Sequence, residues 1–190
     1  PQVSTPGERF AYNNSGFVVL ALIAQRAGKI PFERLVAERV CEPAEMTDTG
    51  FLRSDELPGD VAIGYVAPDG LRSNVFHLPV VGSGDGGIIS SAADMYRFWA
   101  TIYAGRIVSS DTVALMTTPR SDATAEGLRY GLGFWLALHG PAVMLEGYDA
   151  GASFRTVHDP TRNVTHTVLS NTAHGAWPLT KALDQALDIT

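Results

Sequence analysis

The sequence contains little of what disulfide-bonded, zinc-binding or membrane-spanning proteins need. Its 190 residues include one cysteine, Cys41, which excludes an intrachain disulfide and a cysteine-based zinc site. The apolar residues around Cys41 predict a buried, unreactive thiol, and this thiol assigns no compartment. The longest apolar run, residues 16–24, is much shorter than the roughly 20 residues of a membrane-spanning helix. We therefore expect no membrane segment in this chain.

Positive charge is also scarce. The chain has 14 Lys and Arg residues against 20 Asp and Glu residues, giving a net charge of -6. The basic residues are scattered, whereas binding to a phosphate backbone needs them clustered, so we expect no nucleic-acid partner. A hydrophobic content of 45% and a mean hydropathy near zero (+0.05) are typical of a globular chain with one core.

The most informative motif is Tyr12-Asn13-Asn14, which precedes an apolar run. In one kind of acyl-transfer site, a tyrosine placed in this way serves a nucleophilic serine that belongs to a Ser-x-x-Lys motif. No serine of this chain has a lysine three residues later, because the only lysines are Lys29 and Lys181. The chain also starts at Pro1 without Met and directly enters a loop-like sequence, so we expect an upstream segment.

Helical spacing of apolar residues dominates the chain up to about residue 120. Four helices are expected. The first is capped by Asn14 or Ser15 and ends at Gly28, and the second runs from Pro31 to before Pro43 with Arg34 and Glu38 paired. The third starts at Ser91 and ends at Gly105, and the fourth starts at Ser109 or Ser110 and ends before Pro119. The first is apolar on every side, which predicts burial in a core. Residues 42–87, rich in Gly, Pro and Asp, predict loops and short strands.

Beyond residue 120 the pattern changes to that of strands. Leu132, Phe134, Leu136 and Leu138 alternate, and further strands are expected at residues 142–145, 153–158 and 164–170. A last helix should start at Pro178 and pack an apolar face on the sheet, with Leu179, Ala182, Leu183, Ala186 and Leu187 in that face. We predict one α+β domain, with a helical and loop part at about 1–120 and a sheet with a C-terminal helix at about 121–190.

Four segments carry a family resemblance. They are P-G-E-R-F-A-Y-N-N-S-G-F, G-G-I-I-S-S-A-A-D-M, E-G-Y-D-A-G-A-S-F and the later D-P. In this order they resemble the serine β-lactamase and penicillin-binding-protein-like hydrolases, in the branch of class C β-lactamases, esterases and D-alanyl-D-alanine peptidases. The resemblance implies a β-lactamase/transpeptidase-like fold, an antiparallel sheet flanked by helices beside a helical region. It also implies that this chain is a C-terminal portion whose nucleophile lies upstream.

The resemblance assigns roles to Tyr12 and Asn14. It implies that Tyr12 is a general base or proton relay for the serine, and that the Asn14 amide binds the acyl side chain of the substrate. A free phenol has a pKa of about 10, so a phenolate near pH 7 would need about 4 kcal/mol of stabilisation from nearby positive charge. The alternative is a purely structural role, with a tyrosine just before the N-terminus of a helix and an asparagine that caps this helix.

The third motif of that family, Lys/His-x-Gly, is altered here. Aligning Gly147 with the glycine of the motif puts Leu145 at the cation position and Glu146 between them, and shifts of one or two residues find no Lys or His. Either the upstream lysine acts alone or Tyr12 works as a neutral hydrogen-bonding group. We interpret Glu146 as a solvated strand charge in preference to a replacement for the cation. The Tyr148 backbone N–H after Gly147 remains a candidate oxyanion donor.

Two other patterns could indicate a binding site, but each is better explained by a structural role. Gly82-x-Gly84-x-x-Gly87 matches a dinucleotide-binding fingerprint, but no strand, helix, strand unit surrounds it, so we interpret it as a turn. His158 and His166 lie on neighbouring predicted strands and could face each other. Three convergent metal ligands are not evident, so structural histidines are the preferred interpretation.

The functional prediction is a serine hydrolase that cleaves an amide or ester through an acyl-enzyme, with this chain inactive by itself. A triad of Ser153, His158 and Asp159 is set aside because no G-x-S-x-G motif occurs. The expected partner is a small-molecule or peptide substrate, with no cofactor and no metal. A second hypothesis is a non-catalytic homologue that binds a peptide or β-lactam-like ligand, because the third-motif cation is missing.

Overall fold

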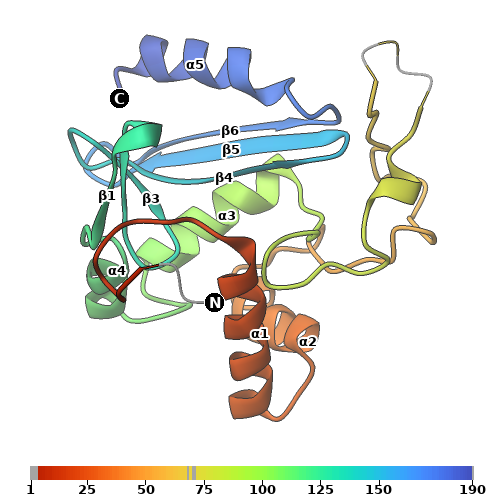
Figure 1. Ribbon diagram of the computed structural model, residues 1–190, viewed down its shortest axis with the longest axis horizontal. Coiled ribbons are helices and arrows are strands. Elements are labelled where there is room, and N and C mark those ends of the chain that lie inside the picture. The colour runs from red at the N-terminus through yellow and green to blue at the C-terminus, as the bar shows by residue number, and fades with distance from the viewer. Residues whose placement is uncertain (1–3, 68, 70–71, 190) are drawn as a thin grey trace.

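The computed structural model describes residues 4–67, 69 and 72–189. An antiparallel sheet forms the centre, with α3 on one face, α5 on the other, and α1 and α2 extending away from it (Figure 1). The helices are α1 (Asn14–Gly28), α2 (Phe32–Val36), α3 (Ala92–Tyr103), α4 (Ser110–Met116) and α5 (Ala176–Leu187). The strands are β1 (Ser121–Ala123), β2 (Leu128–Tyr130), β3 (Trp135–Ala137), β4 (Val143–Asp149), β5 (Ala152–Asp159) and β6 (Val164–Ser170).

The six strands are ordered β1-β2-β3-β4-β5-β6, so each pairs with its neighbours in the sequence. This meander beside helices confirms the predicted α+β fold. β4 pairs with β5 over its whole length, but β3 reaches only Val143 and Met144 of β4. From Leu145 to Asp149, no described strand covers the other edge of β4. The outer edge of β6 is likewise without a neighbouring strand in the described part of the chain.

Two apolar clusters fill the space on the two faces of the sheet. The cluster on the α3 side contains Trp99, Ile102, Val113, Phe134, Leu136 and Val143, and the cluster on the α5 side contains Ala137, Ala142, Met144, Val157 and Ile189. Neighbouring strand residues fall into different clusters because side chains alternate between the faces. Trp99 is fixed further by its indole N–H, which donates to Thr156 Oγ1 at 2.8 Å.

Most local helix signals are confirmed, with shifts of one or two residues. Ser91 caps α3 by accepting the Asp94 N–H, and Ser109 caps α4. The cap of α1 is wrong in the prediction: Asn13, not Asn14 or Ser15, accepts the Gly16 N–H at 2.8 Å, because Asn13 still has extended backbone angles.

The second predicted helix is divided into two parts. Pro31 lies just before α2, and the π-helix η1 (Ala37–Cys41) continues α2 and ends before Pro43 as expected. Arg34 and Glu38 form the predicted ion pair, with Nε and Oε1 at 2.6 Å. Cys41 is buried, and burial raises the pKa of its thiol, which agrees with the expected unreactive cysteine.

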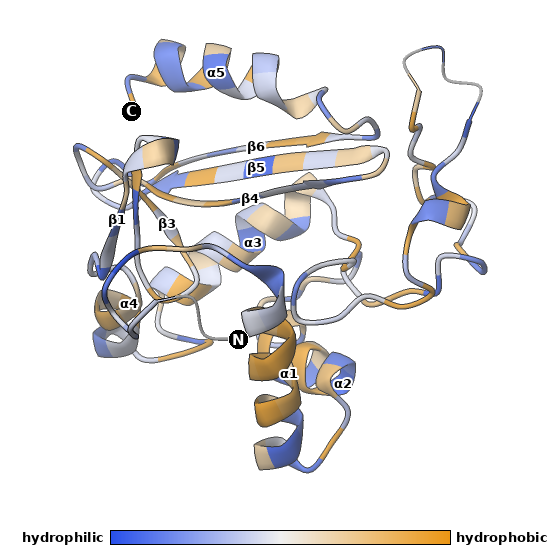
Figure 2. Cartoon of the chain, viewed as in Figure 1, coloured by the Kyte–Doolittle hydropathy of each residue, from blue (hydrophilic) through white to orange (hydrophobic). Residues whose placement is uncertain are grey.

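The predicted burial of α1 is wrong for this chain. Val19, Leu20, Leu22 and Ile23 are 54–58% exposed, and Ala21 is the helix's one buried residue. Figure 2 shows α1 as an apolar helix that projects away from the sheet. The reason is packing: within the described residues, α1 touches mainly α2 and the turn that contains Gly84.

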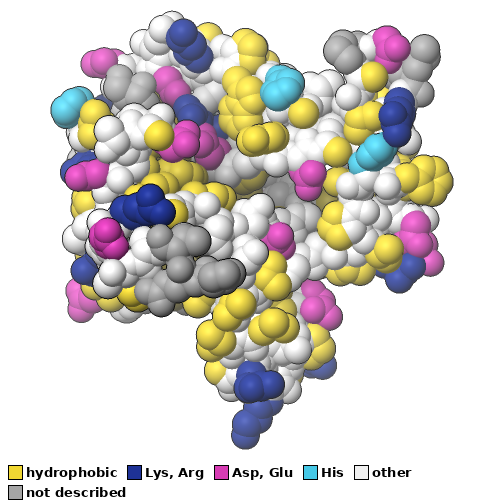
Figure 3. Space-filling model, viewed as in Figure 1, with side chains coloured by type: hydrophobic (Ala, Val, Ile, Leu, Met, Phe, Trp, Pro, Cys, Tyr) yellow, Lys and Arg dark blue, Asp and Glu magenta, His cyan; other side chains and the backbone are white. Residues whose placement is uncertain are grey.

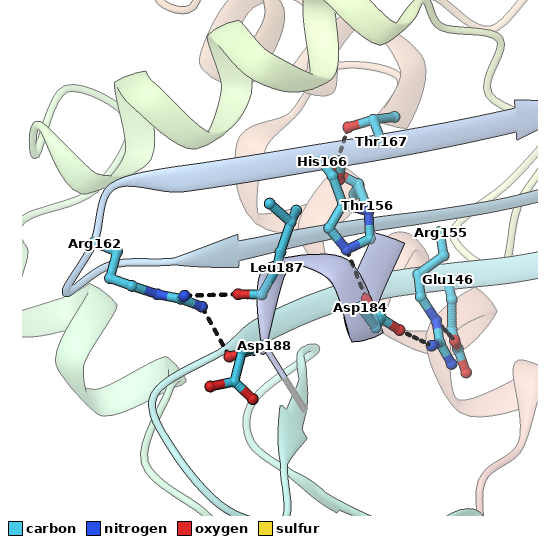
Figure 4. Close-up of polar contacts among 9 residues, drawn as sticks. All are labelled: Glu146, Arg155, Thr156, Arg162, His166, Thr167, Asp184, Leu187 and Asp188. Atoms are coloured by element: carbon cyan, nitrogen blue, oxygen red, sulfur yellow. Dashed lines mark hydrogen bonds and ion pairs between the residues drawn. The ribbon is translucent and has the colours of Figure 1, made fainter. Parts of the chain in front are cut away.

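The predicted apolar face of α5 is correct only in part: the helix packs on β5 and β6, and Leu187 contacts the α5-side cluster, but Leu179, Ala182 and Ala186 are exposed. The helix begins at Ala176, two residues before Pro178, and the residues it buries are Ala176, Thr180 and Asp184. Leu179, placed in the packing face by the sequence pattern, is 61% exposed. The face is set by Asp184, which receives hydrogen bonds from residues of the sheet (Figure 4).

The described part of residues 42–87 forms loops, as predicted, but contains no strand. It has only isolated bridges and the 3-10 helix η2 (Val75–His77). Asp94 on α3 anchors the region by accepting hydrogen bonds from Asp48 N–H and Thr49 Oγ1. In the sheet, Leu132 and Leu138 lie outside β3 and are about half exposed, so the predicted alternation holds only for its central residues.

Asp159 makes acid stability testable. Burial by itself raises the pKa of Asp159, but hydrogen bonds from Arg162 and Thr161 outweigh it and lower this pKa from 3.8 to about 2. Because the folded pKa is the lower one, the stabilisation is present above about pH 4 and is lost as the pH falls towards 2. Asp159→Asn should therefore lower the free energy of unfolding near neutral pH, and its difference from wild type should shrink between pH 4 and pH 2 in urea titrations. A constant difference over that range would contradict this assignment.

Candidate active site

Tyr12 lies in an aromatic cluster formed by the N-terminal segment and the β2–β3 hairpin. Its ring stacks on Trp135 with centroids 5.6 Å apart and also contacts Phe17 and Tyr130. Phe10 packs against the same Trp135 and Tyr130. Tyr12 is 49% exposed, and its hydroxyl makes no hydrogen bond to another described residue. The cluster therefore fixes the ring and leaves the hydroxyl available to a ligand.

The aromatic cluster adjoins the uncovered edge of β4, because Trp135 pairs with Met144, the last β4 residue that β3 reaches. The β4–β5 register places Asp149 opposite Ala152 across a two-residue turn. Antiparallel ladders alternate, so a hydrogen-bonded pair at this turn directs the backbone N–H and C=O of Tyr148 away from β5. The Tyr148 N–H thus lies on the uncovered edge.

The turn after Tyr148 is held by the loop between α2 and α3. Gly151 has φ +70°, and a Cβ on it would lie 2.8 Å from Tyr65 N. The buried Asn74 donates from Nδ2 to Ala150 O at 3.0 Å and accepts the Gly64 N–H at 3.2 Å. Glycine at position 151 is therefore required by both conformation and space, and Asn74 fixes the end of the β4 edge.

Two carboxylates surround Tyr12. Partial burial, then the charge of Asp85, then that of Glu146 raise the pKa of Tyr12. Asp85 belongs to a tight turn in which Gly84 lies against α1, where a Cβ would approach Phe17 O to 2.4 Å. The surroundings therefore favour a neutral phenol at Tyr12.

Glu146 is not the solvated charge that the sequence suggested. Its Oε2 lies 2.6 Å from Arg155 Nε on β5, and Arg155 also contacts Asp184 at 3.2 Å (Figure 4). The side chain of Glu146 is only 21% exposed, because cross-strand neighbours lie side by side on one face. Leu145 points to the other face and packs against the α3-side cluster, so it takes no part in the Tyr12 surroundings.

The other predicted site residues occupy compatible positions. Asn14 is the exposed first residue of α1, and its side chain makes no hydrogen bond to another described residue. Gly147 pairs with Phe154, and a Cβ there would come 3.2 Å from the Phe154 ring. The roles of Tyr12, Asn14, Gly147 and Tyr148 stay predictions.

The sequence pattern missed Trp135 and Asp85 as neighbours of Tyr12, and Arg155 as the partner of Glu146. The one available signal was for Arg155, since a two-residue turn between Asp149 and Ala152 would have placed it opposite Glu146. Nothing in the local sequence indicated that Trp135 or Asp85 lies near residue 12.

His158 and His166 do not face each other, which corrects the sequence prediction. Val157 is paired with His166, so the two histidines lie on opposite faces of the sheet. His158 packs between Trp99 and Tyr103, and His166 Nε2 contacts Asp184 at 2.7 Å. These contacts agree with the structural interpretation, which stays a prediction. Among the described residues no group of three or more His, Cys, Asp or Glu side chains could hold a metal ion.

The other rejected motifs also have structural explanations. Gly82–Gly87 forms a tight turn, with Ser83 and Gly86 exchanging backbone hydrogen bonds, as interpreted. Ser153 Oγ donates to Thr172 O at 2.7 Å and accepts the Ala176 N–H, so it is committed to the start of α5.

None of the described helices is long and apolar enough to span a bilayer.

Comparison with known proteins decides the family. The Beta-lactamase family model matches residues 1–190. The chain belongs to the beta-lactamase family. This membership confirms the resemblance and the β-lactamase/transpeptidase-like fold, and places the chain in a hydrolase superfamily.

Three relatives show how far the beta-lactamase family similarity extends. Protein Rv1367c of Mycobacterium tuberculosis is 31% identical over 86% of this chain and 41% of its own length. The penicillin-binding protein from Bacillus halodurans is 29% identical, with a TM-score of 0.90 over 98% of this chain and 59% of that one. D-amino acid amidase from Ochrobactrum anthropi, 19% identical with a TM-score of 0.80 over 98% of this chain and 60% of that one, shows the fold alone. The chain spans between 31% and 46% of the length of the curated relatives that it matches.

Proposed function

We propose that this chain is part of a serine hydrolase that cleaves an amide or ester through an acyl-enzyme. The nucleophile and its lysine would lie on a segment outside residues 1–190, so the chain alone would be inactive. The observation that carries the proposal is the position of Tyr12: a fixed ring with an available hydroxyl beside the uncovered edge of β4. The substrate would be a small molecule or a peptide.

The surroundings suggest how Tyr12 would act. Partial burial, together with the charges of Asp85 and Glu146, disfavours a phenolate, so the neutral phenol would accept the proton of the attacking hydroxyl while passing its own proton to the leaving group. This relay forms the acyl–oxygen bond, breaks the scissile bond and leaves Tyr12 neutral. The Tyr148 N–H on the β4 edge would stabilise the carbonyl oxygen, together with the N–H of the nucleophile. The Asn14 amide would bind the acyl side chain, and Gly147 would keep the strand open to the substrate.

The charges around Tyr12 favour an esterase or amidase over a β-lactamase. The cation that would hold a β-lactam carboxylate is replaced by Leu145, which packs into the core. Glu146 beside it adds a carboxylate, which is paired with Arg155 on β5. A carboxylated substrate therefore gains no attraction at this motif.

The proposal is tested by covalent labelling of the full-length protein. We expect rapid labelling by a fluorophosphonate and weak or no labelling by a fluorescent penicillin, with both measured as gel fluorescence over time. The isolated 190-residue chain should label with neither. Labelling of the full-length protein by neither probe would exclude an accessible serine nucleophile, and rapid penicillin hydrolysis would overturn the proposed preference.

A non-catalytic binding homologue is the second candidate. The lost third-motif cation favours it, because the phenol of Tyr12 then receives no stabilising charge from the described residues. Such a protein would bind a peptide or β-lactam-like ligand without turnover. Saturable ligand binding by calorimetry, together with no fluorophosphonate labelling, would support this candidate over the hydrolase.

A further inference from the structure

Glu146 and Arg155 form the polar side-chain contact between β4 and β5 that lies closest in register to the Tyr148 N–H, among the described residues. The two are register partners, and Arg155 Nε donates to Glu146 Oε2 at 2.6 Å. Gly147, the next residue of β4, has no side chain, and Ser153, opposite Tyr148, is committed to the start of α5. The contact therefore ties the uncovered part of β4 to β5 just before the candidate oxyanion donor.

The guanidinium of Arg155 is itself held from α5. Its Nη1 lies 3.2 Å from Asp184 Oδ2, and the other oxygen of Asp184 lies 2.7 Å from His166 Nε2. Figure 4 shows these side chains following one another from β4 to α5. The Arg155 side chain is only 22% exposed, and hydrogen bonds between charged groups are stronger than neutral ones. Arg155 is therefore fixed from two sides, with its shorter contact to Glu146.

Negative charge gathers around the candidate site. Figure 3 shows Asp and Glu side chains around the hollow between the sheet and α1. After partial burial, the charges of Asp85 and Glu146 act on the Tyr12 phenol. Among the residues that the structure describes, Arg155 is the only one that forms an ion pair with Glu146. Without Arg155, Glu146 would be an unbalanced carboxylate beside a reaction that develops negative charge on a carbonyl oxygen.

We propose that Arg155 is a positioning residue for this reaction. By pairing with Glu146, it balances a carboxylate that would otherwise repel the developing oxyanion, and it holds the β4 edge that carries the Tyr148 N–H. The inference rests on the proposed function and gives Arg155 a role through Glu146, not through contact with the substrate. Arginine suits this position because its planar fork reaches two carboxylates at once, which a lysine ammonium does less well.

A double-mutant cycle in the full-length protein tests this role. Arg155→Met should lower kcat for an ester substrate about tenfold or more and leave KM within about threefold, because the balanced charge matters most in the transition state. In a Glu146→Gln background, the same Arg155→Met change should lower kcat by less than about threefold, since no carboxylate is left to balance. Equal losses in both backgrounds would show that Arg155 serves only Asp184, and no loss in either would show no role. Each result overturns the proposal.

Two further variants separate this role from loss of stability. Arg162→Met is the matched control, because Arg162 Nε also lies 2.6 Å from a carboxylate oxygen, that of Asp159, but at the other end of β5. It should leave kcat within about twofold, as expected for a distant site. Arg155→Lys keeps the charge and should retain more of kcat than Arg155→Met, which also serves if the methionine variant fails to fold. A loss in Arg162→Met as large as in Arg155→Met, or a lysine variant no better than methionine, contradicts the proposal.

Ionisation at position 12 provides a readout that needs no turnover. A fluorinated tyrosine placed there and followed by fluorine NMR should titrate with a higher pKa in Arg155→Met than in the unchanged protein, because the unpaired Glu146 charge opposes the phenolate. The difference should vanish in the Glu146→Gln background. An unchanged titration in Arg155→Met overturns the charge balance even in an active hydrolase. A shifted titration in a protein that neither hydrolyses esters nor labels with fluorophosphonate would overturn the hydrolase, and with it any role of Arg155 in a reaction, while the charge balance would stand.

Discussion

In the full-length protein, Tyr12→Phe is expected to lower kcat/KM for an ester or amide substrate by about 10²–10⁴-fold, the usual effect of losing a positioned proton-transfer group. The change removes only the hydroxyl, and the ring should keep its stacking on Trp135. Since the hydroxyl bonds to no other described residue, the free energy of unfolding should change by less than about 0.5 kcal/mol. Initial rates and urea titrations measure the two effects.

Tyr96→Phe is the matched control for this variant. Tyr96 is a phenol on α3 that is 62% exposed and outside the aromatic cluster around Tyr12. Its loss should leave kcat/KM within about twofold. If Tyr12→Phe keeps activity like Tyr96→Phe does, Tyr12 transfers no proton and the proposed mechanism fails, even if the protein proves to be a hydrolase.

The fold could be predicted where the signals are local. Ser91 and Ser109 mark the starts of α3 and α4 because a hydroxyl three residues before a free N–H satisfies it without help from elsewhere. The D-P-T-R-N turn separates β5 from β6 because Asp159 caps the turn with its own side chain. Family resemblance then supplied the arrangement of these elements in space.

The faces of two helices could not be predicted, since they depend on distant partners. Apolar residues alone placed Leu179 inward on α5, but Asp184 is buried by its bonds to strand residues. For α1, the pattern indicated burial, but four of its apolar side chains are more than half exposed. A hydrophobic pattern therefore identifies the apolar face of a helix, and only the structure shows whether that face is buried.

The candidate site could be predicted only in part, because some of its members are neighbours that lie far apart in the sequence. Tyr12 and Tyr148 came from motifs, while the environment that raises the pKa of Tyr12 comes from partial burial and from Asp85 and Glu146, which are distant in sequence. The pairing of Glu146 with Arg155 follows from strand register. That pairing is the end of a longer chain of polar contacts, which continues through Asp184 to His166 and connects β4 with α5 (Figure 4).

Asp184 is a buried carboxylate that links α5 to the sheet. It is 5% exposed, its Oδ1 lies 2.7 Å from His166 Nε2, and its Oδ2 lies 3.2 Å from Arg155. A buried charge is stable only when its partners are complete, and removing one partner of a buried pair typically costs about 3–5 kcal/mol. Because the net stability of a domain is about 5–15 kcal/mol, such a loss is a large fraction of it.

Asp184→Ala in the full-length protein should therefore lower the free energy of unfolding by about 3–5 kcal/mol, because it leaves His166 and Arg155 without their shared carboxylate. Asp184→Asn retains an acceptor for His166 and should cost less, about 1–3 kcal/mol. Asp60→Ala, an exposed loop aspartate, should change it by less than about 0.5 kcal/mol. Urea titrations followed by tryptophan fluorescence compare the three. An Asp184→Ala variant as stable as Asp60→Ala would mean that apolar contacts alone hold α5 on the sheet.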